Sequence, residues 1–345
     1  MQEKIFLTGV IILPALLGLL GGCAKKPVVK TTGQSPVAPE SKADIPASKE
    51  QIEIPKKEFR VDVYILPESL LELPSLLGRT SLADINKFSM PQNAKWFVQP
   101  VDKNISDEDL FLFLRDAADV KIRGLSLREC RKVTDAGLAH LKNLSSLKNL
   151  NLWNTQITNA GLAHLKNLSS LKNLNLGKTK ITDAGLVHLK NLSSLKSLNL
   201  WKTKTTDGGP VHLKNLTSLE SLNLGKTKIT DAGLVHLKNL TSLESLILGK
   251  TKITDLGLAH LKNLTSLKFL YLGGTAITDA GLAHLKNLSS LESLFLVKTK
   301  ITDLGLAHLK NLTSLKHLNL SGTKITDAGL RDFKAARPDV SVSSP

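Results

Sequence analysis

The chain repeats itself with a period of 24 residues over most of its length. Eight consecutive units begin with a leucine, at Leu147, Leu171, Leu195, Leu219, Leu243, Leu267, Leu291 and Leu315. A further unit, residues 122–146, precedes them and is one residue longer. One unit of this size cannot bury its own hydrophobic face, so neighbouring units must stack on one another. The repeat therefore predicts an open array of units and makes a single globular core for the 345 residues unnecessary.

Each unit contains the pattern of a strand followed by a short helix, with positions numbered from the leading leucine. Leucines at positions 4 and 6 alternate with polar residues, which predicts a strand with one face inward. Thr-Asp at positions 12 and 13 predicts a helix N-cap, and leucines at 16, 19 and 22 form an apolar helical stripe. Glycine at position 15 predicts a close approach to the neighbouring unit, and threonine at position 9 predicts a hydroxyl bonded to the turn backbone.

The Leu-x-x-Leu-x-Leu head and its fixed period resemble the leucine-rich repeats. The Thr-Asp-x-Gly-Leu continuation is similar to the ribonuclease-inhibitor-like and F-box-associated subclasses more than to the shorter internalin type. The resemblance implies an α/β fold: a right-handed horseshoe-shaped solenoid with a parallel β-sheet on the concave face and short helices outside. Nine repeats would occupy residues 122–338.

The segments on either side of the repeats predict caps and a small additional element. Residues 105–121 match half a repeat and would close the N-terminal end of the stack, while residues 339–345 would cap the other end and continue a last strand from Pro338 to Val342. Residues 58–104 form a poorly defined segment. Apolar and polar residues alternate over 59–65, which predicts a strand, and residues 66–73 predict a helix that begins at Pro67. As far as Trp96 this segment loosely resembles the helical F-box adaptor, despite Pro74 and Pro91.

The first 23 residues have the layout of a secretory signal. A short polar start with one lysine precedes an apolar run, and Leu20-Gly-Gly-Cys23 resembles the lipobox of bacterial lipoproteins. The resemblance implies removal of residues 1–22, lipidation of Cys23 and, with alanine at 24, an outer-membrane destination in the bacterial cell envelope. An uncleaved membrane anchor interrupted by Pro14 is the alternative. Residues 23–57, rich in Pro, Lys and Ser, would form a disordered tether.

Strand positions 3, 5 and 7 are predicted to point onto the concave face, where the fold does not dictate the side chain. Position 5 is Asn in most units, but Ile247, Tyr271 and Phe295 occupy it in three consecutive ones. Neighbouring columns add apolar or aromatic residues, so a contiguous apolar patch would mark a partner-binding site; repeat drift and self-association are the alternatives. The candidate partner-binding residues are Trp153, Trp201, Ile247, Phe269, Tyr271, Phe295, Val297 and His317.

Positive charge is concentrated in the repeats. Residues 122–338 contain 31 Lys+Arg and 13 Asp+Glu, whereas the whole chain has a formal net charge of +16. Lysines recur at positions 8 and 10, on the turn that leaves each strand, and would form two rows along one rim of the concave face. We call these residues the basic rim: Lys178, Lys180, Lys202, Lys204, Lys226, Lys228, Lys250, Lys252, Lys298, Lys300 and Lys324. Such a field favours an anionic protein, glycan, glycolipid or membrane surface. Nucleic acid is disfavoured because base-stacking aromatics interleaved with the lysines are mostly missing.

No residue pattern indicates an enzyme or a bound cofactor. The histidines at position 18 recur without carboxylates or thiols that would complete a metal site, and the recurring Asn-Leu-Ser/Thr is a formal glycosylation sequon within the repeat pattern. Two cysteines exclude a disulfide framework, and Cys130 is expected to be buried filler. In the unit 195–218, Thr205 and Pro210 replace core residues, which predicts a loosened repeat or a flexible seam.

The sequence therefore predicts a non-catalytic, lipid-anchored scaffold that binds a macromolecule on its concave face, without cofactor or metal. The alternative is an F-box-like substrate receptor for a host ubiquitin ligase.

Overall fold

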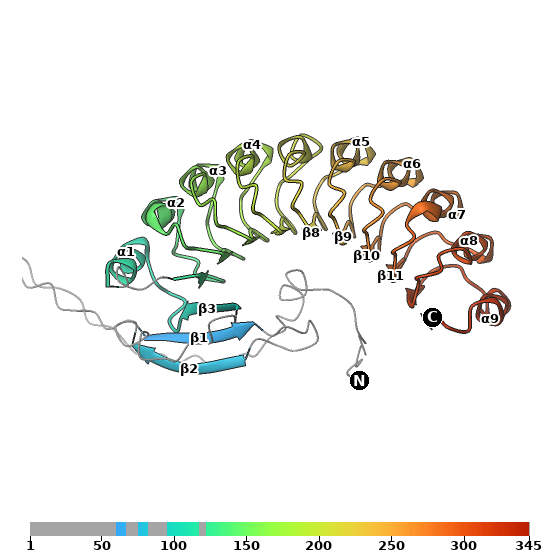
Figure 1. Cartoon of the computed structure of the whole chain (residues 1–345), viewed down its shortest axis with the longest axis horizontal. Coiled ribbons are helices and arrows are strands. Elements are labelled where there is room, and N and C mark those ends of the chain that lie inside the picture. The colour runs from blue at the N-terminus through green and yellow to red at the C-terminus, as the bar shows by residue number, and fades with distance from the viewer. Residues whose placement is uncertain (1–59, 67–74, 82–94, 117–121, 345) are drawn as a thin grey trace, which may run out of the picture.

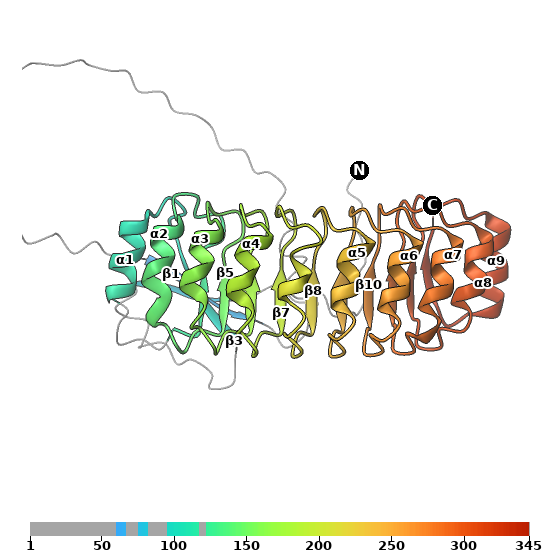
Figure 2. The ribbon, with the colours of Figure 1, turned by 90° about the horizontal axis from the view of Figure 1, so that it is seen from above.

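The computed structural model describes residues 60–66, 75–81, 95–116 and 122–344. The predicted signal peptide, Cys23, the tether and most of the predicted helix at 66–73 lie outside the described residues. The described chain forms an open horseshoe with a sheet along its inner side and helices along its outer side (Figure 1). Seen from above, the helices lie side by side in sequence order (Figure 2).

The sheet has 13 strands in the order β13 through β3, then β1 and β2. The first three are β1 (Arg60–Leu66), β2 (Ser75–Ser81) and β3 (Lys95–Pro100), which pair antiparallel. From β3 onward every pair is parallel. The repeat strands are β4 (Gly124–Ser126), β5 (Asn149–Asn151), β6 (Asn173–Asn175), β7 (Ser197–Asn199), β8 (Ser221–Asn223), β9 (Ser245–Ile247), β10 (Phe269–Tyr271), β11 (Ser293–Phe295), β12 (His317–Asn319) and β13 (Ser341–Ser343). The predicted horseshoe with a concave parallel sheet is therefore confirmed.

The outer layer consists of short helices, most of them one α-helical turn that tightens into a 3₁₀ turn. The α-helices are α1 (Asp107–Asp116), α2 (Asp135–Leu138), α3 (Asn159–Leu162), α4 (Asp183–Leu186), α5 (Asp231–Leu234), α6 (Asp255–Leu258), α7 (Asp279–Leu282), α8 (Asp303–Leu309) and α9 (Asp327–Ala336). The 3₁₀ helices are η3 (Ala139–Asn143), η4 (Ala163–Leu165), η5 (Val187–Leu189), η6 (Pro210–His212), η7 (Val235–Leu237), η8 (Ala259–Leu261) and η9 (Ala283–Asn287). The leucines of both layers meet between them and form one continuous buried core.

Neighbouring repeats are joined on the helical side by a ladder of carboxylate–threonine hydrogen bonds. The aspartate at position 13 accepts hydrogen bonds from the backbone N–H and the hydroxyl of the threonine that begins the next helix. Asp255, for example, accepts from Thr278 at 2.8 Å to N and 2.6 Å to Oγ1. The same pair of contacts recurs from Asp107–Thr134 to Asp303–Thr326, except at Asn159, whose amide oxygen accepts from the Thr182 backbone N–H and whose amide nitrogen donates to the Thr182 hydroxyl. We call this series the Asp–Thr ladder.

Glycine at position 15 makes room for that carboxylate. A Cβ at Gly281 would lie 2.3 Å from Asp255 Oδ1, and a Cβ at Gly257 would lie 2.3 Å from Asp231 Oδ1. Both distances are far below van der Waals contact, so a side chain there would push the neighbouring repeat away. The close approach predicted for this glycine is confirmed, and the group that requires it is the aspartate of the preceding repeat.

Both ends of the stack extend the repeat geometry. At the N-terminal end, β3 pairs with β4 through Val98 and Leu125, and Asp107 of α1 takes the place of a ladder aspartate. At the other end β13 adds the expected last strand, and the buried Phe333 fills the core position of the final helix. The Arg337 guanidinium donates to the carbonyls of Leu312 and Leu315, at 2.9 and 3.0 Å, and covers the last turn.

The segment 58–104 differs from the helical adaptor that its sequence suggested. Its described parts are strands: β1 corresponds to the predicted strand at 59–65, and β2 and β3 pair with it on either side. The helical F-box expectation is therefore wrong for these residues. Alternation of side chains in such short strands is a weak signal, and the register of the pairing depends on contacts far apart in sequence.

The aberrant repeat at 195–218 keeps its place in the stack but lacks an α-helical turn. Only η6 forms, with Pro210 in its first turn. Thr205 is fully buried where other units have isoleucine, and its hydroxyl lies 2.9 Å from that of Thr203, which satisfies the buried polar group. The ladder also continues here, because Asp183 accepts from Thr206.

We expect Asp255→Ala to lower the free energy of unfolding by about 1–2 kcal/mol, because two hydrogen bonds to Thr278 are lost. Chemical denaturation followed by circular dichroism measures the effect. Asp255→Asn is the matched control, since Asn159 occupies the same position in its own repeat and bonds Thr182 through both its oxygen and its nitrogen. Equal destabilisation by the two substitutions would show that the ladder does not depend on these bonds.

Candidate interaction surface

The concave face is lined by positions 3, 5 and 7 of the repeat strands. The parallel register places Ile247 beside Tyr271 and Tyr271 beside Phe295, so the three apolar residues of position 5 are immediate neighbours on β9, β10 and β11. Phe269 and His317 lie in the same rows at position 3, on either side of Ser293. The structure therefore brings the predicted C-terminal members of the surface together.

The aromatic rings of this region contact one another. The Tyr271 and Phe295 centroids are 5.9 Å apart in a stacked arrangement, and the Phe269 and Phe295 centroids are 5.2 Å apart and tilted. Burial raises the pKa of the Tyr271 hydroxyl. We call Ile247, Phe269, Tyr271, Phe295 and Val297 the apolar strip; four of the five are partly exposed. Ser293, between the phenylalanines and His317, has a buried hydroxyl without a hydrogen-bond partner among the described atoms.

Two residues expected to be exposed on the concave face are buried. Trp153 and Phe269 are each 2 % exposed, so the expectation of exposure is wrong for them. Phe269 lies between the small residues Ser245 and Ser293 and packs against the Phe295 ring. Trp153 leans over Gly177, where a Cβ would lie 2.2 Å from the indole ring. Large side chains on this face therefore fold down onto small neighbours instead of standing over their own strand.

The asparagines at position 5 have a structural role that the sequence analysis missed. Each side-chain oxygen accepts a hydrogen bond from the backbone N–H two residues later, as in Asn199 to Trp201 at 2.9 Å and Asn223 to Gly225 at 2.9 Å. An asparagine two residues before a turn was the signal that could have revealed it. Ile247, Tyr271 and Phe295 carry no acceptor at that place. Three adjacent repeats thus lack a bond worth about 1 kcal/mol and carry apolar surface instead.

The two tryptophans of position 7 form a pair in the N-terminal half of the face. Trp153 and Trp201 belong to repeats that are not adjacent, yet their rings stack with centroids 5.0 Å apart across Gly177. Lys226 Nζ lies 4.5 Å from the Trp201 centroid, and Lys178 Nζ lies within 6 Å of both rings at 5.7 and 5.9 Å. Aromatic rings are therefore interleaved with the lysines in this region, contrary to the sequence-based expectation.

All eleven lysines of the basic rim are exposed, and none forms an ion pair within the described part of the chain. Burial lowers the pKa of Lys226, and the positive charges of Lys250, Lys202 and Lys178 lower it further. The lysines of one row therefore lie close enough to repel one another. Such a row attracts anions.

The position-8 lysines also have an unfavourable backbone conformation. Lys178, Lys202, Lys226, Lys250 and Lys298 all have φ between 55° and 57°, in the left-handed region. The equivalent residues of two other repeats are Gly274 and Gly322, which adopt this conformation without steric cost. A lysine here costs about 1 kcal/mol relative to an unstrained backbone. Stability of the turn therefore does not explain why five repeats carry lysine.

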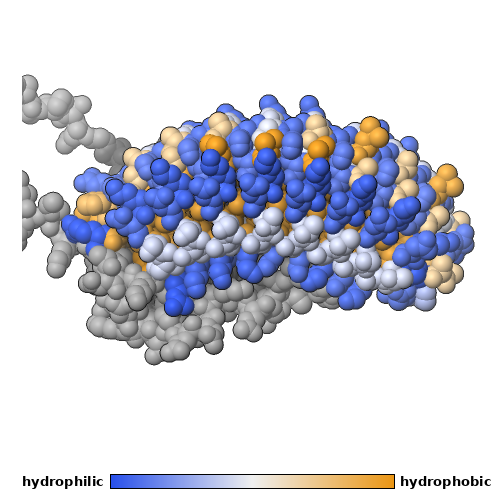
Figure 3. Space-filling model, turned by 45° about the horizontal axis from the view of Figure 1, so that its top comes forward, coloured by the Kyte–Doolittle hydropathy of each residue, from blue (hydrophilic) through white to orange (hydrophobic). Residues whose placement is uncertain are grey.

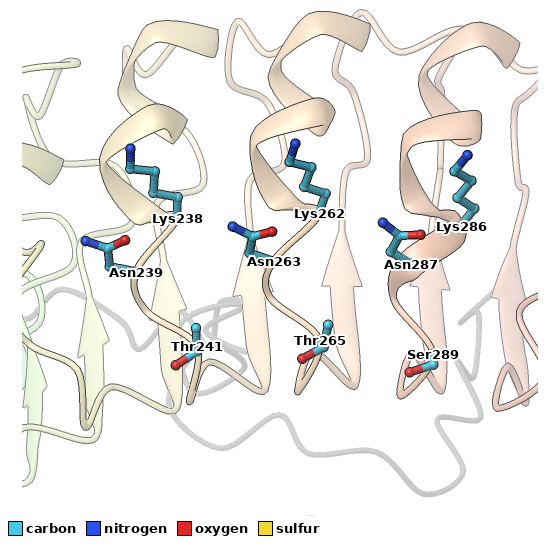
Figure 4. A pocket seen from close by; sticks show the side chains of 9 residues that line it. All are labelled: Lys238, Asn239, Thr241, Lys262, Asn263, Thr265, Lys286, Asn287 and Ser289. Carbon is cyan, nitrogen blue, oxygen red and sulfur yellow. The ribbon is translucent and has the colours of Figure 1, made fainter.

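The outer side of the solenoid is mainly hydrophilic, with separate hydrophobic spots (Figure 3). Leu256 and Leu304 are its most exposed large apolar side chains among the described residues, at 73 % and 77 %. An open groove of about 850 Å³ runs along three repeats and is lined by the same Lys, Asn and Ser/Thr positions of each, from Lys238 to Ser289 (Figure 4). Three asparagines of the formal sequons, Asn239, Asn263 and Asn287, line this groove, and their regular recurrence follows from the repeat.

The remaining candidate groups do not form a reactive site. Cys130 is fully buried at the position of the threonine row, and burial raises the pKa of its thiol to about 11, which keeps it protonated. The described residues contain no group of three metal-ligating His, Cys, Asp or Glu side chains. Within the same residues, no helix has the length and apolar character needed to span a bilayer.

Comparison with known sequence families places leucine-rich repeats at three positions of the solenoid. A "Leucine Rich repeat" profile matches residues 167–189, a "Leucine rich repeat" profile matches 217–277, and a two-copy "Leucine Rich repeats" profile matches 289–332. The solenoid is a leucine-rich-repeat fold. The three segments fall within the units defined by the 24-residue period. Leucine-rich repeats are typical of protein-interaction scaffolds, and no curated protein matches the sequence.

Solved structures of leucine-rich-repeat proteins are similar to this chain. An internalin from Listeria monocytogenes is 25 % identical, with 78 % of this chain and 90 % of that chain covered and a TM-score of 0.41. A plant peptide hormone receptor, RGFR1 in complex with RGF2, is 15 % identical with a TM-score of 0.43 and coverages of 66 % and 41 %. A TDR receptor is 17 % identical with a TM-score of 0.47 and coverages of 70 % and 46 %. The chain thus spans less than half of either receptor chain.

We expect Gly177→Ala to separate the tryptophan pair of this leucine-rich-repeat face, because the new methyl group would overlap the Trp153 ring. Circular dichroism in the indole bands measures the loss of coupling between the stacked rings. Gly273→Ala is the matched control: it makes the same change in the same column but meets the Tyr271 hydroxyl instead. An unchanged spectrum for Gly177→Ala would contradict the stacked arrangement.

Proposed function

We propose that the protein is a non-catalytic scaffold that binds a protein partner on the concave face, with the apolar strip as the centre of the contact. The observation that supports this most is the replacement of asparagine by Ile247, Tyr271 and Phe295 in three adjacent repeats. The fold gains a backbone hydrogen bond from asparagine at this position, as in Asn223 and Asn319, and has no structural need for an apolar residue there.

The apolar strip has the amino-acid composition that is typical of the centre of a protein–protein interface. Aromatic side chains are enriched at the energetically dominant positions of protein interfaces, and they contribute most where neighbours exclude water. Tyr271 and Phe295 are partly exposed and already fixed by stacking, so they would lose little conformational freedom on binding.

In this proposal the basic rim orients the partner and raises the rate of association. Its exposed lysines carry no compensating carboxylates, so the field at this edge attracts a partner with an acidic surface. Rim charges affect association rates and salt dependence more than they affect the lifetime of a complex. The burial at the strip and the charge at the rim therefore act on different steps of binding.

We expect Tyr271→Ala/Phe295→Ala to weaken partner capture by at least about tenfold, since two central aromatic contacts are removed. A photoreactive phenylalanine analogue at Val297 in the full-length chain would trap the partner in envelope membranes, and mass spectrometry would identify and quantify it. Leu256→Ala/Leu304→Ala is the matched control, because it removes two exposed apolar side chains from the outer surface. Equal trapping by the two double variants would refute the concave-face proposal.

We further propose that Cys23 is lipidated and holds the solenoid at a bacterial membrane, with the outer membrane as its destination. The support is the Leu-Gly-Gly-Cys sequence at the end of an apolar run, followed by alanine. The Pro-, Lys- and Ser-rich residues 24–57 would give the folded part a reach of roughly 30 Å from the membrane.

We expect Cys23→Ser to abolish metabolic labelling of the protein by radioactive palmitate and to leave an unprocessed precursor. Cys130→Ser is the matched control, because Cys130 is buried in the solenoid and should not affect labelling. Palmitate incorporation into the Cys23→Ser protein would exclude Cys23 as the attachment site.

A further inference from the structure

We propose that one edge of the solenoid lies against the surface of an anionic phospholipid bilayer. It is the edge where the helices end and the next strands begin. Eight consecutive repeats present the same three exposed side chains there, a lysine at position 20, an asparagine at 21 and a serine or threonine at 23, from Lys142 to Thr313. We call this surface the lysine edge. The inference rests on the lipid anchor proposed at Cys23 and is independent of the partner proposed for the apolar strip.

The fold arranges these side chains in rows that point outward. Leu261 and Leu264 are fully buried, so the lysine and asparagine between them are turned toward solvent, and the other repeats have the same pattern. Lys238, Lys262 and Lys286 lie side by side along the open groove, with the asparagines and hydroxyl groups of the same repeats next to them (Figure 4). Ammonium, amide and hydroxyl groups all donate hydrogen bonds to phosphate oxygens. The lysine edge is therefore a continuous row of donors for phosphate.

The positive charge of the lysine edge is not neutralised by nearby carboxylates. No acidic residue occurs at positions 20 to 24 of these eight repeats. The adjoining position 2 carries three glutamates, and each of them pairs with a lysine of the same position: Glu220 with Lys196 at 2.5 Å, Glu244 with Lys268 at 3.0 Å and Glu292 with Lys316 at 3.0 Å. Within the described part of the chain, none of the position-20 lysines forms an ion pair. The electrostatic field of this edge is thus positive over eight repeats.

The opposite edge, which carries the basic rim, is less uniform in charge. Its lysine row at position 8 is interrupted by Gly274 and Gly322. The helices begin on that side, so the aspartates of the Asp–Thr ladder, such as Asp255 and Asp279, also lie there. The lysine edge has neither an interruption nor an aspartate. It is therefore the edge that better matches a uniformly anionic plane.

The composition of the lysine edge favours a bilayer over an acidic protein or a nucleic acid. Positions 20 to 24 contain no aromatic residue in any of the eight repeats, whereas the centres of protein interfaces and base-stacking sites are rich in them. Phospholipids diffuse laterally, so anionic headgroups can gather at the lysines whatever the spacing of the repeats, and each lysine adds a small favourable interaction. A lipid anchor together with a basic surface attaches a protein to a membrane more firmly than either does alone.

Contact through the lysine edge determines the orientation of the solenoid. The strands run from the lysine edge to the basic rim, so they would stand upright on the membrane with the basic rim farthest from it. The pairing of Val61 with Pro100 places the start of β1 at the opposite edge. Residues 24–59 can extend to about 120 Å, which is ample to reach back past a solenoid with three-residue repeat strands. The concave face then opens sideways, and the apolar strip stays accessible.

Fluorescence quenching on vesicles tests the proposal with the full-length, lipidated protein. A fluorophore is attached at Asn263→Cys on the lysine edge or, as the matched control, at Ala276→Cys on the opposite edge; both positions are exposed, whereas Cys130 is buried. The vesicles contain phosphatidylcholine with a nitroxide quencher on its headgroup, with or without phosphatidylglycerol. We expect phosphatidylglycerol to raise quenching at position 263 by at least about threefold and to leave quenching at position 276 unchanged. Equal quenching at the two positions, or no effect of phosphatidylglycerol at position 263, would overturn the proposal and leave a soluble acidic partner as the occupant of this edge.

Flotation of the same samples separates the edge contact from the lipid anchor. Retention on neutral vesicles at high salt measures the anchor alone, whereas quenching at position 263 should decrease at high salt. A protein that is retained but shows no quenching dependent on phosphatidylglycerol would contradict the edge contact and leave the anchor intact. Retention only on vesicles with phosphatidylglycerol, with quenching at position 263, would exclude the anchor and support the edge contact.

Charge substitutions test which edge makes the contact. We expect Lys238→Gln/Lys262→Gln/Lys286→Gln to reduce the phosphatidylglycerol-dependent quenching at position 263 by at least about threefold. The matched control Lys228→Gln/Lys252→Gln/Lys300→Gln removes the same charge from the basic rim and should leave this quenching unchanged. Equal losses in the two triple variants would show that net charge alone attracts the protein to the vesicles, which is incompatible with docking by this edge.

Discussion

The carboxylate of one repeat, held by the threonine of the next, is the interaction on which the solenoid depends. Each contact combines three requirements: an acceptor at position 13, a threonine at position 12 of the following unit, and a glycine that leaves room between them. Leucine burial supplies most of the driving force for stacking but is not directional. The Asp–Thr ladder fixes the offset of each repeat on its neighbour, and that offset brings the concave columns into register.

The repeat pattern sufficed to predict the solenoid because its constraints lie within 24 residues. Leucine spacing, the threonine hydroxyl at position 9 and the glycine at position 15 each have a local signature, and the structure has them in the predicted places. The sequence pattern placed Asp255 only at the start of its own helix. A single unit does not show that this carboxylate accepts hydrogen bonds from Thr278 of the next unit. The pairing of β1 with β2 and β3 was missed for the same reason, since it joins segments that share no period.

The candidate surface was predicted less well than the fold, because columns of positions do not determine how side chains lie. Trp153 and Phe269 were placed on the correct face, yet both are buried by leaning onto Gly177 or packing between serines. The asparagine column looked like unconstrained polar surface, although each side chain holds a turn. Because the asparagine at this position stabilises a turn, Ile247, Tyr271 and Phe295 replace a residue that contributes to the fold and not one that is free to vary.

The polarity of the Asp–Thr ladder bears on how such a chain can change in length. Each repeat presents an acceptor on one side and a threonine on the other, so removal or duplication of one whole 24-residue unit would leave matching partners at the new junction. Loss of a number of residues that is not a multiple of 24 would leave no matching partners at the junction. Growth by unequal exchange between the near-identical units would thus lengthen or shorten the lysine row in whole steps while the caps stay the same. The length of the concave face can therefore change without any change in the fold of the individual repeats.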